Sequence, residues 1–304
     1  MKFTDFFRNR SGPVISFEVF PPKTDAAMQQ LRRVLPELIA LRPSYMTVTY
    51  GALGSTRQRT LEIASLIRQE YAMETACHLT CVGSSKSDLD RMLGDIRRAQ
   101  IDNIVALRGD PPKGEAQFVP PPDGYRHADE LVAHIRRYTG HSGFDRFGVA
   151  VAGYPEKHVE APDLATDIRH LKQKVDAGAD LVITQLFYDN ADFYRFVELA
   201  RAAGITVPIV PGLLPIQSAK QIRRITSLCG AKIPPALESE LAAAADNDPA
   251  AEDVGVRQTI AQATDLLRHG APGIHFYVLN KSTHMAHIFE RLRPLIDELS
   301  PPPA

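Results

Sequence analysis

The chain has 304 residues, of which 44% are hydrophobic, so it can build one large core but not two. Its 35 basic and 36 acidic side chains give a net charge of -1, and its paired arginines fall in separate helical segments, which argues against a nucleic-acid partner. No apolar stretch approaches the ~18 residues of a membrane span, the N-terminus lacks a signal-peptide core, and 3 cysteines suit a reducing compartment, so we expect a cytoplasmic protein with no membrane partner.

Short apolar or β-branched runs alternate along the chain with turns and with stretches of helical spacing, which predicts a parallel sheet in an α/β protein. The predicted strands are residues 14–19, 45–49, 75–80, 103–107, 147–152, 181–185, 207–211 and 274–278. Eight such strands predict closure into a (β/α)8 TIM barrel. We expect residues 1–300 to form this single catalytic domain and residues 301–304 to form a disordered tail.

The predicted helices carry ordinary start signals. Ser87 is expected to cap one of them, with Asp90 three positions later, and its apolar face comprises Leu89, Met92, Leu93 and Ile96. The interval between the seventh and eighth strands is the longest, and it predicts two helices, at 235–245 and 250–269, so that an extra helix decorates the barrel. The proline-rich segment 111–124 predicts an irregular, mobile loop.

Polar residues end most of the predicted strands. In a (β/α)8 barrel the active site forms at the carboxyl ends of the strands, so these residues are expected to meet in one place. They are Glu18, Thr49, Tyr50, His78, Arg108, Gly109, Asp110, Tyr154 and Gln185.

Glu18 has the most distinctive surroundings, because aromatic residues flank it and two prolines end its strand. Limited hydration there predicts a raised pKa. A carboxylic acid that keeps its proton near neutral pH can protonate a leaving nitrogen, so Glu18 is a candidate general acid. The alternative is a glutamate that forms an ion pair at the barrel mouth.

Arg108, Gly109 and Asp110 follow a predicted strand directly. Glycine permits close backbone approach and arginine offers a planar donor fork, which suits an anionic ligand, although a structural ion pair would use the same residues. A metal site at Cys77, His78 and Cys81 is not expected, because on a strand His78 points away from the two cysteines. Dinucleotide-binding glycine fingerprints, phosphate loops and zinc-protease motifs do not occur in the sequence.

Nine motifs, taken in order, resemble those of the methylenetetrahydrofolate reductase family. They are residues 17–22 (FEVFPP), 48–52 (VTYGA), 78–81 (HLTC), 107–110 (LRGD), 152–156 (AGYPE), 172–179 (KQKVDAGA), 183–189 (ITQLFYD), 211–215 (PGLLP) and 275–280 (HFYVLN). The resemblance covers nearly the whole chain. It implies an oxidoreductase of one-carbon metabolism and methionine biosynthesis, of the length of the bacterial catalytic form.

The resemblance further implies that 5,10-methylenetetrahydrofolate is reduced to 5-methyltetrahydrofolate. Hydride would pass from NADH or NADPH through FAD in ping-pong fashion, and the protein would form a homo-oligomer. Glu18 would be the general acid that opens the folate, and Asp110 would lie beside the flavin pyrimidine edge and influence its charge.

The same resemblance implies a set of binding residues. FAD would contact Tyr50, Ala52, His78, Arg108, Gly109, Asp110, Ala128, Tyr154, His158, Ala161, Asp167 and Lys174. The nicotinamide would contact Thr49, and the substrate side would comprise Gln185, Gln221, Tyr277 and Lys281.

Some positions depart from the family pattern. Lys281 stands where arginine is common, and His170 and Gln173 stand where asparagine and arginine often lie near the dinucleotide phosphates. His127 precedes Ala128 in place of a usual tyrosine.

Three alternatives stay open at this point. The barrel could receive electrons from an iron-sulfur partner subunit instead of a nicotinamide. It could pass hydride directly to the folate without a flavin. It could also be a catalytically silent scaffold, which the retained polar residues at the strand ends argue against.

Overall fold

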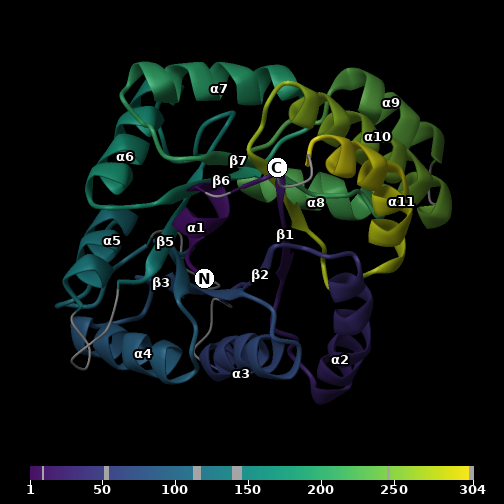
Figure 1. The fold of residues 1–304 in the computed structure, drawn as a ribbon. Coiled ribbons are helices and arrows are strands. Elements are labelled where there is room, and N and C mark those ends of the chain that lie inside the picture. Colours follow the sequence, from purple (N-terminus) through teal and green to yellow (C-terminus); the bar gives the residue numbers. More distant parts are fainter. Residues whose placement is uncertain (9, 51–54, 112–117, 139–145, 245–246, 301–304) are drawn as a thin grey trace.

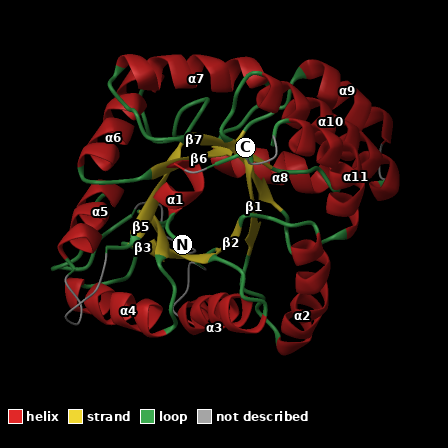
Figure 2. Ribbon diagram, viewed as in Figure 1, coloured by secondary structure: helices red, strands yellow, loops and turns green. Residues whose placement is uncertain are grey.

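The computed structural model describes residues 1–8, 10–50, 55–111, 118–138, 146–244 and 247–300. Eight parallel strands close into one barrel in chain order, and helices surround it (Figures 1 and 2). The strands are β1 (Val14–Val19), β2 (Tyr45–Val48), β3 (Thr75–Thr80), β4 (Asn103–Leu107), β5 (Gly148–Gly153), β6 (Leu181–Leu186), β7 (Ile209–Leu213) and β8 (Gly273–Tyr277). The predicted (β/α)8 barrel is therefore confirmed.

Amphipathic helices cover the outside of the sheet, as the helical spacing of the sequence predicts. They are α2 (Asp25–Ala40), α3 (Ser55–Glu70), α4 (Lys86–Arg98), α5 (Ala128–Arg137), α6 (Leu164–Asp176), α7 (Asn190–Ala202), α8 (Ala219–Cys229), α9 (Pro235–Ala244), α10 (Asp248–Arg268) and α11 (Thr283–Glu298). Within the described residues, no helix combines the length and the apolar character that crossing a bilayer requires.

The seventh strand lies two residues later than predicted, because Gly212 belongs to the strand and not to a turn. Its N–H donates to the Thr184 hydroxyl at 2.9 Å, and a Cβ at Gly212 would lie 2.1 Å from the Thr184 carbonyl oxygen. Glycine is thus what allows β6 and β7 to approach so closely here.

Helix α4 is capped by Ser85, so the prediction of Ser87 as its cap was wrong. The Ser85 hydroxyl accepts from the Asp88 N–H, and the Asp88 carboxylate accepts from the Ser85 N–H at 3.0 Å, which completes a capping box. Ser87 lies in the first turn. The predicted apolar face is otherwise correct, since Leu89 and Leu93 are fully buried.

The two helices predicted between the last two strands are present as α9 and α10. Helix α10 begins two residues earlier than predicted, because Asn247 caps it through its contact with the Ala250 N–H and a proline occupies its first turn. With α8 these helices form a second apolar cluster around Ile216, Leu237 and Leu241, next to the main core.

Two further predictions fall partly or wholly on residues that the structure does not describe. The predicted tail, residues 301–304, lies outside the described residues, as do residues 112–117 of the predicted loop 111–124. Residues 118–124 contain turns without helix or strand.

A short helix that the sequence did not predict, α1 (Phe3–Arg8), lies inside the ring of strands (Figure 1). Phe3 is fully buried there, and its ring meets that of Tyr45 edge to face at a centroid distance of 5.2 Å. The Asn103 side chain accepts from the Phe3 N–H and donates to the Met1 carbonyl oxygen, both at 2.8 Å. Because these contacts lie at the amino ends of the strands, α1 closes that end of the barrel.

Candidate active site

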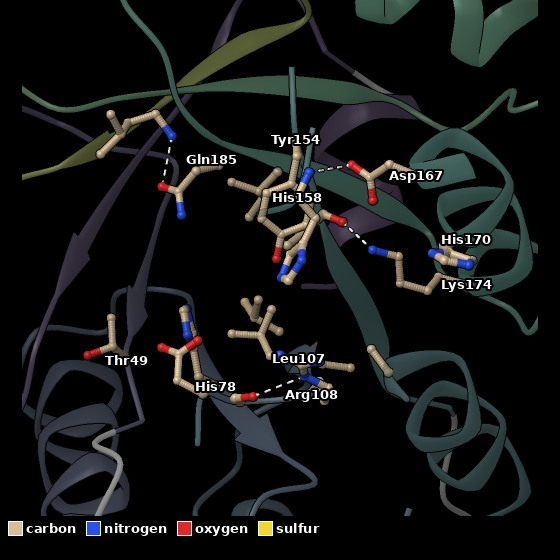
Figure 3. A pocket seen from close by; sticks show the side chains of 18 of the residues that line it. Thr49, His78, Leu107, Arg108, Tyr154, His158, Asp167, His170, Lys174 and Gln185 are labelled. Atoms are coloured by element: carbon tan, nitrogen blue, oxygen red, sulfur yellow. Dashed lines mark hydrogen bonds between the residues drawn. The ribbon is translucent and has the colours of Figure 1, made fainter. Parts of the chain in front are cut away.

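A cavity of about 850 Å³ opens at the carboxyl ends of the strands. Its volume lies within the range of about 300 to 1,000 Å³ that is typical of ligand and cofactor sites. Figure 3 shows Thr49 and His78 on one side of it and His170 and Lys174 on the opposite side, with Tyr154 and His158 between them.

Most of the residues predicted for the site line this one cavity. They are Glu18, Thr49, His78, Arg108, Gly109, Asp110, Ala128, Tyr154, His158, Ala161, Asp167, Lys174, Gln185 and Tyr277. They come from every part of the barrel between β1 and β8, so closure of the sheet brings together side chains up to 259 positions apart.

Four predicted residues do not belong to the described lining. The Tyr50 hydroxyl lies 3.7 Å from the sulfur of Met92, and Gln221 lies in the first turn of α8, where its N–H donates to Ser218. Lys281 is exposed beyond the end of β8. Ala52 lies outside the described residues.

Side chains of three other strands, β2, β3 and β8, contact the Glu18 carboxylate, all at its Oε2 atom. The Thr47 hydroxyl donates to Oε2 at 3.0 Å, and His275 Nε2 lies within hydrogen-bonding distance at 3.2 Å. His78 Nε2 is 3.0 Å away, but its ring is not oriented for a hydrogen bond, so that contact is electrostatic. Glu18 also lines the cavity.

The prediction that the pKa of Glu18 is raised was wrong for this arrangement. Burial does push its pKa upward, but the attraction of His78 and the hydrogen bond of His275 outweigh burial and hold the pKa well below its ordinary value. The error came from the neighbours in the sequence: Phe20 is 40% exposed and does not shield the carboxylate. The decisive partners come from β2, β3 and β8.

Arg108 forms a bidentate ion pair with Glu160, at 2.5 and 2.7 Å. This matches the structural alternative considered for Arg108, yet both side chains also line the cavity. Gly109 adopts a φ of +89°, and a Cβ there would lie 2.7 Å from Val82 Cγ1. Glycine is therefore required for the backbone to pass between the cavity and β3.

The side of the cavity farther from Glu18 contains a half-buried lysine. Lys174 Nζ donates to the Ala152 carbonyl oxygen and lies 5.8 Å from the centre of the Tyr154 ring. Burial lowers the pKa of Lys174 to about 8. The ring of His158 packs edge-on against Tyr154 at 4.7 Å, and the backbone N–H of His158 donates to the Asp167 carboxylate (Figure 3).

The structure contains no group of three or more histidine, cysteine or acidic side chains, among the residues it describes, that could hold a metal ion. Cys77 is buried, and burial raises the pKa of its thiol to about 12. The thiol of Cys81 contacts the carbonyl oxygens of Leu107 and His127. Both cysteines thus pack as small apolar residues.

Sequence reasoning missed three residues that shape the site: Thr47, Glu160 and His275. His275 and Thr47 lie inside apolar runs, where a polar residue reads as an ordinary strand position. The period of two along a strand was the available signal, because β8 places His275 across from Ser16 and next to Glu18 in the register. Glu160 lies in a loop and gave no signal.

A family model described as methylenetetrahydrofolate reductase matches residues 3–293. Methylenetetrahydrofolate reductase (NADH) 1 of Arabidopsis thaliana is 42% identical over 292 residues, which make up 93% of this chain and 48% of that protein. The 5,10-methylenetetrahydrofolate reductase of Pectobacterium carotovorum subsp. carotovorum is 36% identical over 269 residues, 88% of this chain and 86% of that protein. The chain thus spans about half the length of the plant relative.

A solved structure also shares the fold. An uncharacterized protein from Clostridium thermocellum, described as binding two copies of 5-methyl-5,6,7,8-tetrahydrofolic acid, superposes with a TM-score of 0.63. It is 15% identical and covers 97% of this chain and 98% of its own. At that identity the likeness concerns the barrel architecture alone.

Proposed function

The chain belongs to the methylenetetrahydrofolate reductase family, and from this premise we propose that it reduces 5,10-methylenetetrahydrofolate to 5-methyltetrahydrofolate with NADH or NADPH through FAD. One observation carries the proposal: Glu18, Asp110 and Gln185 line the same cavity at the open end of the barrel. An acid, a fixed charge and an amide are thereby within reach of one bound ring system.

The residues present fit a flavin dinucleotide. Thr49 and Lys174 line opposite sides of the cavity (Figure 3), and the cationic or hydrogen-bonding side chains Arg108, His158 and Lys174 in its lining would suit a diphosphate. Gly109 lines the cavity directly after β4, in a backbone conformation that a larger residue would strain. A flavin bound here would accept a hydride from the nicotinamide and return it to the folate.

Lys174 supports a prediction about pH. Because its pKa is about 8, its ammonium group is charged below that pH and loses the charge as the pH rises through it. We expect the affinity of the apoprotein for FAD to fall above pH 8. A charge-assisted hydrogen bond contributes roughly 1.5 to 3 kcal/mol, so the Lys174→Met variant should bind FAD about tenfold or more weakly at pH 7 and lose the pH dependence.

Fluorescence titration of the apoprotein with FAD at pH 6 to 10 measures this effect. Lys172→Met is the matched control, because Lys172 lies on the same helix but pairs with Asp176 away from the cavity. Equal pH dependence in the wild type and in Lys174→Met would contradict the assignment.

Glu18 is ionised in the ligand-free cavity, and its proposed role as a general acid requires a proton. Burial is the strongest single influence on its pKa. A ligand that covers the exposed 14% of the Glu18 side chain would move its pKa upward, toward the protonated form, when the folate is in place. The acid would then donate its proton to the folate nitrogen that leaves the methylene carbon.

The remaining proposed roles follow from position. Asp110 would place a negative charge near the flavin ring, and Thr49 and Gln185 would contact the nicotinamide or the folate. The Tyr277 hydroxyl donates to the Thr184 carbonyl oxygen at 2.7 Å, which fixes the ring as a wall of the substrate side. Gln221 and Lys281, which are not in the described lining, would contact the folate only at the outer mouth.

An absorption spectrum of the purified protein, followed by anaerobic addition of reductant, tests the proposal. We expect a yellow protein that NADH or NADPH bleaches and that 5,10-methylenetetrahydrofolate reoxidises. A colourless protein that still oxidises NADH with folate would instead indicate direct hydride transfer. A yellow protein that neither nucleotide bleaches would indicate a separate electron-donating partner.

A further inference from the structure

His275 is a fully buried histidine that links Glu18 to a second polar residue of β1. Its Nδ1 lies 2.8 Å from the Ser16 hydroxyl, and its Nε2 lies 3.2 Å from Glu18 Oε2. Ser16 and Glu18 are two positions apart on one strand, so their side chains point to the same face, and β8 pairs His275 directly with Ser16. The three residues therefore form a continuous chain of hydrogen-bonding groups.

The Ser16 hydroxyl can either donate or accept, because its O–H rotates. When the His275 ring is neutral with its proton on Nε2, Ser16 donates to Nδ1 and the ring donates to the carboxylate. When the ring carries two protons, Nδ1 donates to Ser16. When the proton of Nε2 moves to Oε2, Nδ1 still donates to Ser16, and the carboxylic acid donates back to Nε2. Each of these states keeps every polar atom of the chain paired.

We infer that His275 and Glu18 share one proton across their contact, and that His275 is the positioning residue that keeps Glu18 supplied with it. In the open site the His275 ring carries a proton on each nitrogen, so that the pair is an imidazolium and a carboxylate. When a ligand covers the site, the proton passes from Nε2 to Oε2, leaving a neutral ring and a carboxylic acid. The net charge of the pair is unchanged, so no other group has to take up or release a proton. This inference rests on the proposed function only where it says that Glu18 gives the proton to the folate.

The other titratable groups around this pair come from three strands. Tyr277 packs edge-on against the His275 ring at 5.1 Å, but its hydroxyl donates to a carbonyl oxygen, and burial raises its pKa well above 10. Burial likewise raises the pKa of Tyr45, so both phenols stay neutral. Among the described neighbours, the remaining titratable group is His78, whose Nε2 contacts Glu18 Oε2 without a hydrogen bond.

Nitrogen NMR of histidine-labelled protein tests the shared proton without reference to any reaction. The signals are assigned with His275→Gln and His78→Gln, and they are followed from pH 5 to 9 in the wild type and in Glu18→Gln. Removal of a carboxylate in contact with an imidazolium should lower the midpoint of the His275 titration by about one pH unit or more. An unchanged His275 midpoint, or a change confined to His78, would overturn the inference.

The rate at which folate reoxidises the reduced holoenzyme gives a second measurement. In His275→Gln the amide cannot hold the proton, so the alkaline limb of the pH–rate profile should move to lower pH, with a loss of about 10-fold or more at pH 7.5 and recovery in acid. Ser16→Ala should also move the alkaline limb to lower pH, by a smaller shift than His275→Gln. A loss of rate that is equal at every pH would show a structural role and contradict the inference.

His284→Gln is the matched control, since His284 is also buried, at 1% exposure, but lies on α11 beside Gln217. Its pH profile should equal that of the wild type. If the wild-type protein does not react with folate at any pH, the proposed function fails. The NMR titration still decides whether the proton is shared. If His275→Gln does not fold, Ser16→Ala gives the same decision.

Discussion

Replacing Glu18 by glutamine is expected to slow the reaction with folate by about 100-fold to 10,000-fold, the range over which a well-placed general acid accelerates a reaction. Glutamine keeps the size of the side chain and can still accept from Thr47 and pair with His275, but it has no proton to give. Reduction of the holoenzyme by NADH requires no acid at this position. That half-reaction should therefore keep its rate within a few-fold.

Anaerobic stopped-flow absorbance measures the two half-reactions separately. Glu156→Gln is the matched control, because Glu156 is a partly buried glutamate that accepts from the Lys232 N–H outside the lining of the cavity. It should leave both rates unchanged. If Glu18→Gln slows both half-reactions by the same factor, the residue shapes the site as a whole and is not its acid.

Gly109→Ala is expected to weaken FAD binding by about tenfold or more and to lower the free energy of unfolding by about 2 to 4 kcal/mol. Two effects add. An alanine at a φ of +89° is strained, and its Cβ would meet Val82 Cγ1 at 2.7 Å and Thr80 Cβ at 3.2 Å. Both neighbours are β-branched and buried, so relief must come from the backbone that carries Arg108 and Asp110.

Gly270→Ala separates the two effects. Gly270 has a similar φ of +82°, but a Cβ there would have no atom within 4 Å. It should lose about 1 kcal/mol from the strained backbone alone and bind FAD normally. Denaturant unfolding and FAD titration of both variants give the comparison, and equal losses of stability would show that the contact with Val82 contributes nothing.

The barrel could be predicted because its strands are local patterns: each is a short apolar run that ends at a turn, and eight in succession leave few other topologies. Element boundaries were less certain. From the sequence, Gly212 looks like a turn residue, but it belongs to β7. Its close contact with Thr184, which the sequence does not reveal, requires a glycine. Helix α1 was not predicted because its 6 residues are too few to show a helical pattern of apolar positions.

The lining of the cavity was predictable to a large extent, because the carboxyl ends of the strands meet at one rim of the barrel. The electrostatics of the site could not be predicted from the sequence. The pKa of Glu18 depends on His78 and His275, which lie 60 and 257 positions away, and their distances of about 3 Å arise only when the sheet closes. The ion pair between Arg108 and Glu160 depends in the same way on the path of a loop.

The position of α1 at the amino end of the barrel bears on how ligands reach the active-site cavity. Phe3 is fully buried there and its N–H donates to Asn103, so α1 fills the amino end of the barrel, opposite the cavity at the carboxyl ends of the strands. Under the proposed function, nucleotide and folate would both bind in the cavity at the carboxyl ends of the strands, so one would leave before the other binds.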